Sequence, residues 1–196
     1  MLDSFVKDKA HQYIIFDPES ETKIQCDAAN DSYAGALGSI IVKKGMKQCW
    51  TFMVDAGTKY VQFGIMSTDV IESIDVIEDN LDKIHKGYGL MVPIYITLHG
   101  RGAADKDIQQ YVEQFEINPR TNLIISMELD MTQKENSNGI LKYIIHNEVK
   151  DDIETVRTDD KYSNIAYDNV DINKEYRMSV SFDWQACDAW IQLVDL

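Results

Sequence analysis

Two carboxylates stand close together in the apolar run LIISMELD, and this pair is the first pattern in the chain that could do chemistry. Glu128 and Asp130 lie two residues apart in a predicted strand, so their side chains share a face and could act as a general acid and base. The chain has 33 Asp and Glu residues in 196, however, so such pairs arise by chance. We interpret Glu128 and Asp130 as the exposed face and the end of a strand, and we predict a protein that is not an enzyme.

The other common catalytic and metal-binding motifs are absent from the sequence. The four histidines have no HExxH or HxxxH spacing, so a helical zinc site is not supported. Gly100-Arg101-Gly102 lacks the third glycine of a dinucleotide fingerprint, and neither the P-loop motif nor the GxSxG nucleophile elbow occurs. We therefore predict no catalytic residue, no metal site and no cofactor.

The charge balance limits the classes of partner. Lys and Arg number 19 against 33 Asp and Glu, which gives a net charge of −14 at pH 7. Proteins that bind nucleic acid or anionic membrane surfaces present basic patches, and the densest basic run here is Lys43-Lys44 followed by Lys47. We expect no nucleic acid and no membrane among the partners. The acidic surface either keeps the domain soluble or favours a basic protein or peptide.

The cysteines and the N-terminus indicate the compartment. Cys26, Cys49 and Cys187 make an odd count without a CxxC motif, which argues against a disulfide framework or a zinc site. The first residues, MLDSFVKDKAHQYIIF, lack the apolar core of a signal peptide, and no segment approaches the roughly 20 apolar residues of a membrane span. We expect a cytoplasmic, reduced location and a monomer.

Short apolar runs rich in β-branched and aromatic residues, separated by turn residues, make up most of the chain. Such runs, without crossover helices between them, predict an all-β antiparallel sandwich. Alternation places Trp50 on a buried face, and the two strands joined by Asp55-Ala56-Gly57-Thr58 are predicted to form a hairpin. The predicted strands are Tyr13–Phe16, Ser39–Val42, Cys49–Val54, Val61–Met66, Leu90–Thr97, Leu123–Asp130, Leu141–His146, Met178–Phe182 and Ala189–Val194.

One segment departs from the strand pattern. Ser67–Lys86 carries apolar residues at a spacing of three to four, which predicts a short surface helix or a partly helical insertion. Gly100–Thr121 and Glu148–Ile172 are predicted to be long polar connections, and these are either binding elements or padding. Trp184 follows a predicted strand end, where it either anchors a protein interface or closes the bottom of the sandwich.

The order of several short motifs resembles the SPRY/B30.2 family. The runs LIISMELDM, NGILKYIIHNEV and IAYDNVDINKEYRMSVSF, followed by AWIQLV, are similar to its succession of C-terminal strands. Two glycines, a tryptophan that opens a long strand and a closing Gly-Ile follow the family's order in the N-terminal half. The matching residues are Gly38, Gly45, Trp50, Gly64, Ile65, Leu129, Asp130, Gly139, Leu141, Tyr143, Asn147, Tyr176 and Ser181.

The resemblance implies a bent β-sandwich of two antiparallel sheets, a concanavalin-like jelly roll with long loops and at most one or two short helices. The SPRY-like domain would span residues 27–196, with residues 1–26 as an N-terminal extension that packs on the sandwich. Such a domain is a non-catalytic protein-interaction module, and it would serve as the substrate-recognition or adaptor part of a larger assembly.

The resemblance also implies a peptide-binding site in loops at one edge. In members that recruit substrates to ubiquitin ligases, the loop after the Y-x-x-x-x-S motif carries a tryptophan that borders the peptide pocket, and Trp184 matches that position. The segment Asp27–Tyr33 would form another wall of the pocket. The implied site residues are Trp184, Asp183, Gln185, Asn30, Tyr33, His99 and Arg101. A lectin-like carbohydrate-binding sandwich is the alternative, because such sandwiches look alike in sequence, and an enzyme ranks third.

Overall fold

The computed structural model describes residues 2–27, 34–55, 61–71, 87–92, 97–100, 106–107, 122–132, 138–146, 165–182, 186 and 188–195. This part of the chain contains 14 strands and one short helix. The strands are β1 (Phe5–Ala10), β2 (Ile14–Asp17), β3 (Ser20–Cys26), β4 (Ala34–Val42), β5 (Lys47–Val54), β6 (Val61–Ser67), β7 (Gly87–Val92), β8 (Thr97–Gly100), β9 (Lys106–Asp107), β10 (Leu123–Asp130), β11 (Gly139–His146), β12 (Ile165–Val170), β13 (Tyr176–Phe182) and β14 (Trp190–Val194). The helix is α1 (Thr68–Ile71).

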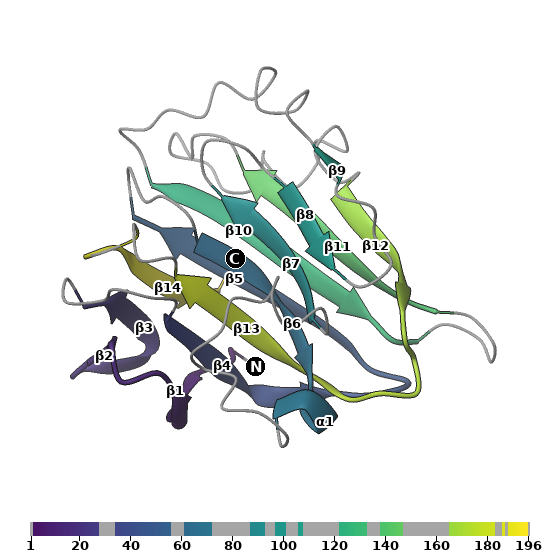
Figure 1. The fold of residues 1–196 in the computed structure, drawn as a ribbon, viewed down its shortest axis with the longest axis horizontal. Coiled ribbons are helices and arrows are strands. Elements are labelled where there is room, and N and C mark those ends of the chain that lie inside the picture. The colour runs from purple at the N-terminus through teal and green to yellow at the C-terminus, as the bar shows by residue number, and fades with distance from the viewer. Residues whose placement is uncertain are drawn as a thin grey trace.

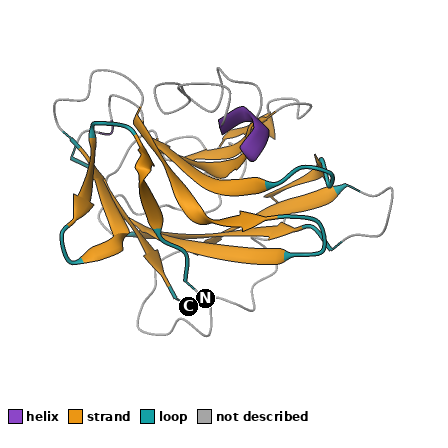
Figure 2. Cartoon of the chain, turned by 90° about the horizontal axis from the view of Figure 1, so that it is seen from below, coloured by secondary structure: helices purple, strands orange, loops and turns teal. Residues whose placement is uncertain are grey.

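The strands form two antiparallel sheets, which lie face to face as the layers of a sandwich (Figure 1). Sheet I has the order β1-β4-β13-β6-β7-β8-β9, and sheet II has the order β12-β11-β10-β5-β14-β3-β2. Figure 2 shows the two layers from below, with α1 in purple. The predicted all-β sandwich with at most one or two short helices is confirmed. The N-terminal residues contribute to both layers, because β1 belongs to sheet I whereas β2 and β3 belong to sheet II.

The core lies between the sheets and is built from alternate residues of the strands. Trp50 and Phe52 of β5 are buried, which confirms Trp50 as a core residue. The ring of Phe52 lies 4.8 Å from the ring of Phe63 on β6, measured between centroids. The hydroxyl of Tyr143 on β11 donates to the carbonyl oxygen of Phe63 at 3.0 Å, and burial raises its pKa well above the ordinary value. This hydroxyl therefore stays protonated and links the two sheets.

The hairpin predicted around Asp55–Thr58 is wrong. β5 pairs with β10 and β14 in sheet II, whereas β6 pairs with β13 and β7 in sheet I. The connection crosses from one sheet to the other, so the apolar faces of β5 and β6 meet across the core. Alternation shows which face of a strand is buried. It does not show whether two strands lie side by side in one sheet or stack across the core, because both arrangements bury the same residues.

Two other expectations need correction. The predicted strand Leu90–Thr97 is a pair of antiparallel strands, β7 and β8, in which Leu90 is the partner of Leu98. The predicted connection Glu148–Ile172 contains β12, which pairs with β11 at the edge of sheet II. The strands β1 and β3 were not predicted, because half of FVKDKA and most of SETKIQC is polar. Each has a partly exposed face, so few apolar residues reveal it.

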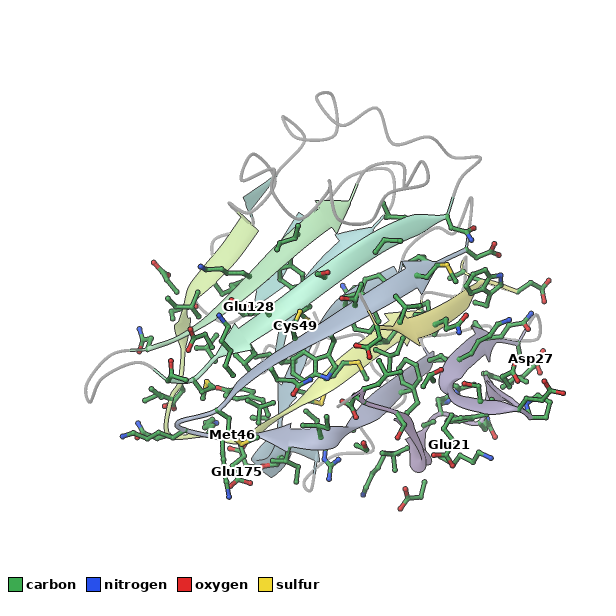
Figure 3. All side chains as sticks on the ribbon, turned by 180° about the vertical axis from the view of Figure 1, so that it is seen from behind. Glu21, Asp27, Met46, Cys49, Glu128 and Glu175 are labelled. Carbon is green, nitrogen blue, oxygen red and sulfur yellow. The ribbon has the colours of Figure 1, made fainter. Side chains whose placement is uncertain are left out.

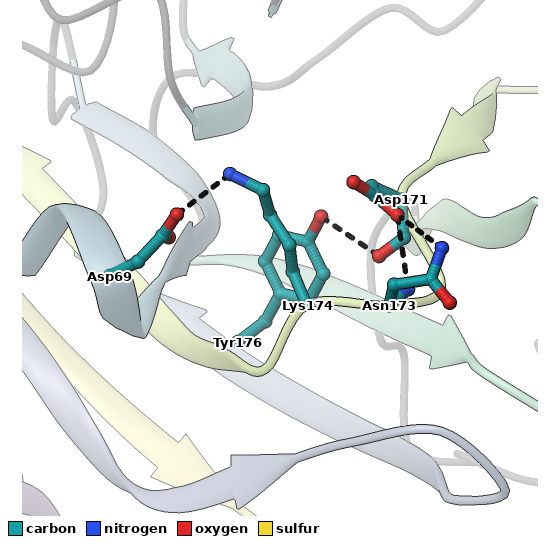
Figure 4. Close-up of polar contacts among 5 residues, drawn as sticks. All are labelled: Asp69, Asp171, Asn173, Lys174 and Tyr176. Atoms are coloured by element: carbon teal, nitrogen blue, oxygen red, sulfur yellow. Dashed lines mark hydrogen bonds and ion pairs between the residues drawn. The ribbon is translucent and has the colours of Figure 1, made fainter.

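The predicted helical segment Ser67–Lys86 begins with a single turn of helix, α1, and residues 72–86 lie outside the described part of the chain. Figure 4 shows how α1 contacts the turn between β12 and β13, where Lys174 Nζ lies 2.8 Å from Asp69 Oδ2. In that turn the Asn173 amide nitrogen and the Tyr176 hydroxyl both donate to Asp171. None of the described helical residues forms a helix long and apolar enough to cross a membrane.

A buried carboxylate ties the N-terminus to the sandwich. Asp3 is 2% exposed, and its Oδ2 accepts a hydrogen bond of 2.7 Å from the indole Nε1 of Trp50. Its Oδ1 accepts from four donors, which are Ser4 N, Ser39 N, Ser39 Oγ and Ile40 N, at 2.6 to 3.0 Å. Gly38 makes room for this carboxylate, because a Cβ there would lie 2.5 Å from Asp3 Oδ2.

Three of the five donors to Asp3, which are on Ser39 and Ile40, belong to a bulge in β4. Between the paired positions Arg177–Ile41 and Ser179–Leu37 the register shifts, so β4 carries extra residues opposite β13. Such a bulge leaves backbone groups outside the ladder. The Arg177 guanidinium donates to the carbonyl oxygens of Gly38 and Ser39 at 2.9 and 2.8 Å, and Asp3 accepts from the amide groups. The bulge is therefore hydrogen-bonded on both sides.

Candidate binding site

One end of the sandwich collects connections that cross between the sheets. The chain passes from sheet II to sheet I between β3 and β4 and between β5 and β6, and it returns between β13 and β14. The strand register shows that these connections lie at the same end of sheet I, because Phe182 is the partner of both Ala34 and Val61. Val61 is in turn the partner of Val92. We call the row Ala34, Phe182, Val61 and Val92, with the connections that meet it, the loop-bearing end.

Most of the predicted site residues lie outside the described part of the chain. These are Asn30, Tyr33, Arg101, Asp183, Trp184 and Gln185. The segment 28–33 leads directly into Ala34, and the segment 183–185 directly follows Phe182. Ala34 and Phe182 are register partners, so the two predicted walls of the pocket are joined to neighbouring positions of sheet I.

The seventh predicted site residue, His99, belongs to β8, and Arg101 directly follows that strand in the sequence. His99 lies in this strand as the register partner of Gly89, and its side chain is outside the described part. β8 ends at Gly100, the partner of Tyr88, whereas the row of the loop-bearing end passes through Val92. Arg101 therefore follows the end of β8 that is remote from the loop-bearing end. The roles of all these side chains stay predictions.

Backbone hydrogen bonds fix the chain just after the segment that carries Trp184. The amide of Cys26 donates to the carbonyl oxygen of Ala189 at 3.0 Å, and the amide of Asp188 donates to that of Cys26 at 3.1 Å. Asp188 has a φ of +64°, a left-handed conformation that Asp adopts more readily than most residues. The residues that flank the segment 183–185 are thus Phe182 of sheet I on one side and Asp188, bonded to β3 of sheet II, on the other.

Two buried polar side chains lie one residue inside the loop-bearing end. Phe63 points into the core, so its neighbour Gln62 points to the outer face of sheet I, and Ser181 is the register partner of Gln62. Gln62 is 2% exposed and Ser181 is 5% exposed. Among the described residues, no hydrogen-bond partner reaches either amide atom of Gln62 or the hydroxyl of Ser181. Neither residue is among the predicted site residues, and the only signal for Gln62 is its place inside the apolar run VQFGIM.

Solved structures identify the fold, although no family profile and no curated protein sequence matches the chain. The PSpry domain of TRIM65 superposes with a TM-score of 0.64 and 10% sequence identity, over 100% of this chain and 90% of that domain. The chain has the SPRY/B30.2 fold. Stonustoxin superposes with a TM-score of 0.58 and 9% identity, and there the match covers 99% of this chain and 27% of the toxin chain. At these identities the likeness establishes the fold alone.

The paired carboxylates lie on the outer face of sheet II of this SPRY fold, where Figure 3 shows Glu128 beside Cys49 of the neighbouring strand. Lys47 Nζ lies 3.0 Å from Glu128 Oε1 and 4.0 Å from Asp130 Oδ2. The hydroxyl of Thr132 donates to Asp130 Oδ1 at 2.6 Å, and this bond is the main cause that lowers the pKa of Asp130. The bond to Glu128 is the main cause that raises the pKa of Lys47.

These contacts give the two carboxylates a structural explanation in the SPRY fold. Asp130 accepts both the hydroxyl and the amide of Thr132 and so closes the turn after β10, while Glu128 pairs with Lys47 across the strands. A general acid needs a raised pKa, and the pKa of Asp130 is lowered. Over the described ranges, no group of three or more His, Cys, Asp or Glu residues is arranged to hold a metal ion.

Proposed function

We propose that this domain is a non-catalytic interaction module that binds a short peptide or a protein surface through the loop-bearing end. The observation that carries the proposal is the register pair Ala34–Phe182, which joins the segments 28–33 and 183–185 to neighbouring positions of one sheet. The SPRY/B30.2 fold supports it, because the family resemblance of the sequence points to the same two segments. In this role the domain is the substrate-recognition or adaptor part of a larger assembly.

The construction of the loop-bearing end suits recognition of an extended ligand. Loops that are short and anchored on rigid strands lose little entropy when they bind, and an aromatic side chain among them offers contact area at low cost. Phe182 in β13 and Asp188 in the turn bonded to β3 are fixed on either side of the segment 183–185. Trp184 is the proposed anchor, with Asp183, Gln185, Asn30 and Tyr33 as polar and aromatic neighbours.

The charge of the chain shapes the proposed partner. A net charge of −14 favours a peptide with Lys or Arg near its ends, and the attraction acts chiefly on the association rate. The same charge disfavours nucleic acid and anionic membranes as ligands. We also propose that the domain acts in the reduced cytoplasm, on the odd count of three cysteines without a CxxC motif, and that it acts as a monomer.

The direct test is peptide binding with a tryptophan variant. Peptides selected from a random phage-displayed library on the wild-type chain are titrated into wild type, Trp184→Ala and Ile41→Ala. Ile41 is a matched control, because it is an exposed apolar residue at the opposite end of β4. We expect Trp184→Ala to weaken binding at least tenfold, as removal of a central interface tryptophan does, and Ile41→Ala to leave it unchanged.

Equal affinity of wild type and Trp184→Ala would remove Trp184 from the site. A glycan array run in parallel tests the alternative class, because a peptide-binding module gives no sugar-dependent signal. Saturable binding to one sugar class, without any peptide enriched, would replace the proposal with a lectin-like function.

A further inference from the structure

The strongest unexplained feature of the molecule is the buried amide of Gln62. A primary amide offers two donors and one acceptor, and burial without partners is costly because the group gives up its bonds to water. Both amide atoms of Gln62 are buried, and no described group bonds to either of them. Native proteins pair nearly all such groups, so an unpaired one needs an explanation.

Ser181 makes the feature a pair. It is the register partner of Gln62 on the adjacent strand, its hydroxyl is also buried, and it too has no hydrogen-bond partner in the described ranges. On its other side the partner of Ser181 is Gly35, which has no side chain. Three orphan polar atoms, two of Gln62 and one of Ser181, thus lie side by side on the outer face of sheet I.

The position of the pair links it to the proposed peptide site. Gln62 and Ser181 directly adjoin Val61 and Phe182, two residues of the row that defines the loop-bearing end. Two residues further along β6, on the same outer face, Gly64 is the partner of Gly89, so neither β6 nor β7 carries a side chain at that position. Glycine positions of this kind allow another backbone to approach a sheet closely. The pair therefore lies one row from Phe182, the residue that directly precedes the segment 183–185 in the sequence.

We infer that Gln62 and Ser181 are the amide-recognition subsite of this peptide site, and the inference rests on the proposed function. The chemical complement of a carboxamide that offers a donor and an acceptor side by side is a second amide group. The ligand group is the main-chain peptide unit of the bound peptide or the side-chain amide of an Asn or Gln within it. Gln62 supplies specificity, because a ligand without the amide leaves all three atoms unpaired.

The test measures binding and stability of the same variants of the full chain. A peptide selected on wild type is titrated into Gln62→Leu, Ser181→Ala and Ser126→Ala. Ser126 is the matched control, because its buried hydroxyl on the outer face of sheet II already bonds to Thr51 Oγ1. We expect Gln62→Leu to lower the affinity at least tenfold and Ser181→Ala about threefold, with no change in Ser126→Ala. The thermal midpoint of Gln62→Leu should equal or exceed that of wild type, since leucine buries no polar atom.

Each other result overturns the inference in a distinguishable way. A Gln62→Leu chain that binds as well as wild type overturns the subsite and leaves the proposed function intact, whereas a failure to enrich any peptide overturns both. A lowered thermal midpoint or failure to fold in Gln62→Leu shows that the amide already has a partner inside the protein.

The side-chain amide protons of Gln62 in wild type give a second readout, and they must shift when the peptide is added. Alanine and N-methyl scans of the peptide separate the side-chain source from the main-chain source.

Discussion

Asp3 and Gln62 each expose 2% of their surface, yet their surroundings are opposite. The Asp3 carboxylate accepts five hydrogen bonds from the bulge of β4, from Ser4 and from Trp50. The Gln62 amide has no hydrogen-bond partner in the described part of the chain. Burial alone therefore does not tell what a polar side chain does.

The difference separates a structural role from a binding role. A satisfied buried group stabilises the fold and loses much when its partners are removed, whereas an unsatisfied group costs stability until something binds it. Asp3 connects the N-terminus, β4 and the core tryptophan of β5, which are far apart in the sequence. Gln62 and Ser181 lie beside the loop-bearing end, where the proposed ligand arrives.

The largest effect is expected from removal of the Asp3 carboxylate. Asp3→Ala leaves the indole of Trp50 and the amides of the bulge without an acceptor, and each buried orphan donor costs about 1 to 3 kcal/mol. We expect a loss of about 3 kcal/mol or more in the free energy of unfolding, measured by urea denaturation. Asp8→Ala, an exposed acid of β1, is the control and should change the value by less than about 0.5 kcal/mol. A loss no larger than that of the control would show that the carboxylate contributes nothing.

Gly38→Ala tests the same site through packing. The new Cβ would lie 2.5 Å from Asp3 Oδ2 and 2.7 Å from Met178 Cε, so the carboxylate must shift from its donors. We expect a loss of about 1 to 3 kcal/mol, typical of overpacking. In an Asp3→Ala background the same substitution should cost less, because one of the two clashes is gone. Additive losses in this double-mutant cycle would contradict the proposed contact.

A pair of serine variants sharpens the comparison between the two outer faces. Ser126→Ala removes a buried hydroxyl that bonds to Thr51 on sheet II at 3.0 Å, and it should cost about 1 kcal/mol. Ser181→Ala removes an unpartnered buried hydroxyl on sheet I and should cost nothing or stabilise slightly. Urea unfolding of both variants side by side decides the matter. Equal losses would mean that the Ser181 hydroxyl is satisfied within the fold.

The smallest effect concerns Asp130 and depends on pH. The pKa of Asp130 is lower in the folded chain, mainly because of the Thr132 hydroxyl, so its contribution to stability is present above the unfolded pKa and disappears as the pH falls through the folded pKa. Asp130→Asn should lower stability at pH 7 by about 0.5 kcal/mol. This difference from wild type should shrink below pH 4 in urea unfolding at several pH values. A constant difference down to pH 2 would refute the assigned cause.

Sequence patterns predicted which face of each strand is buried better than they predicted which strands lie next to each other. β10 has the predicted bounds, and Trp50 and Phe63 are in the core as alternation requires. β5 and β6 were paired wrongly, because alternation is the same for a hairpin and for strands that stack across a core. β12 was missed because the polar residues Asp168 and Asn169 interrupt the apolar residues of its short sequence, IAYDNV.

The site could be predicted only where a motif marked it. The segments 28–33 and 183–185 came from the family resemblance, and the register of β4 with β13 joins them to one end. Asp3 has no local signal, and Gln62 has only its position inside the apolar run VQFGIM. The partners of Asp3 are 36 to 47 residues away apart from Ser4, and the lack of partners for Gln62 is a property of the folded chain. Long-range contacts of this kind become visible only once the strands are arranged in space.

The most direct test of the account is a map of peptide binding by backbone amide shifts in ¹⁵N-labelled protein. A peptide selected on the wild-type chain should shift the amides of Ala34, Val61, Gln62, Ser181 and Phe182, which form two adjacent rows at the loop-bearing end. The amides of Lys47, Glu128 and Asp130 on sheet II should stay unchanged. Shifts confined to sheet II or to the turn between β12 and β13 would contradict the account.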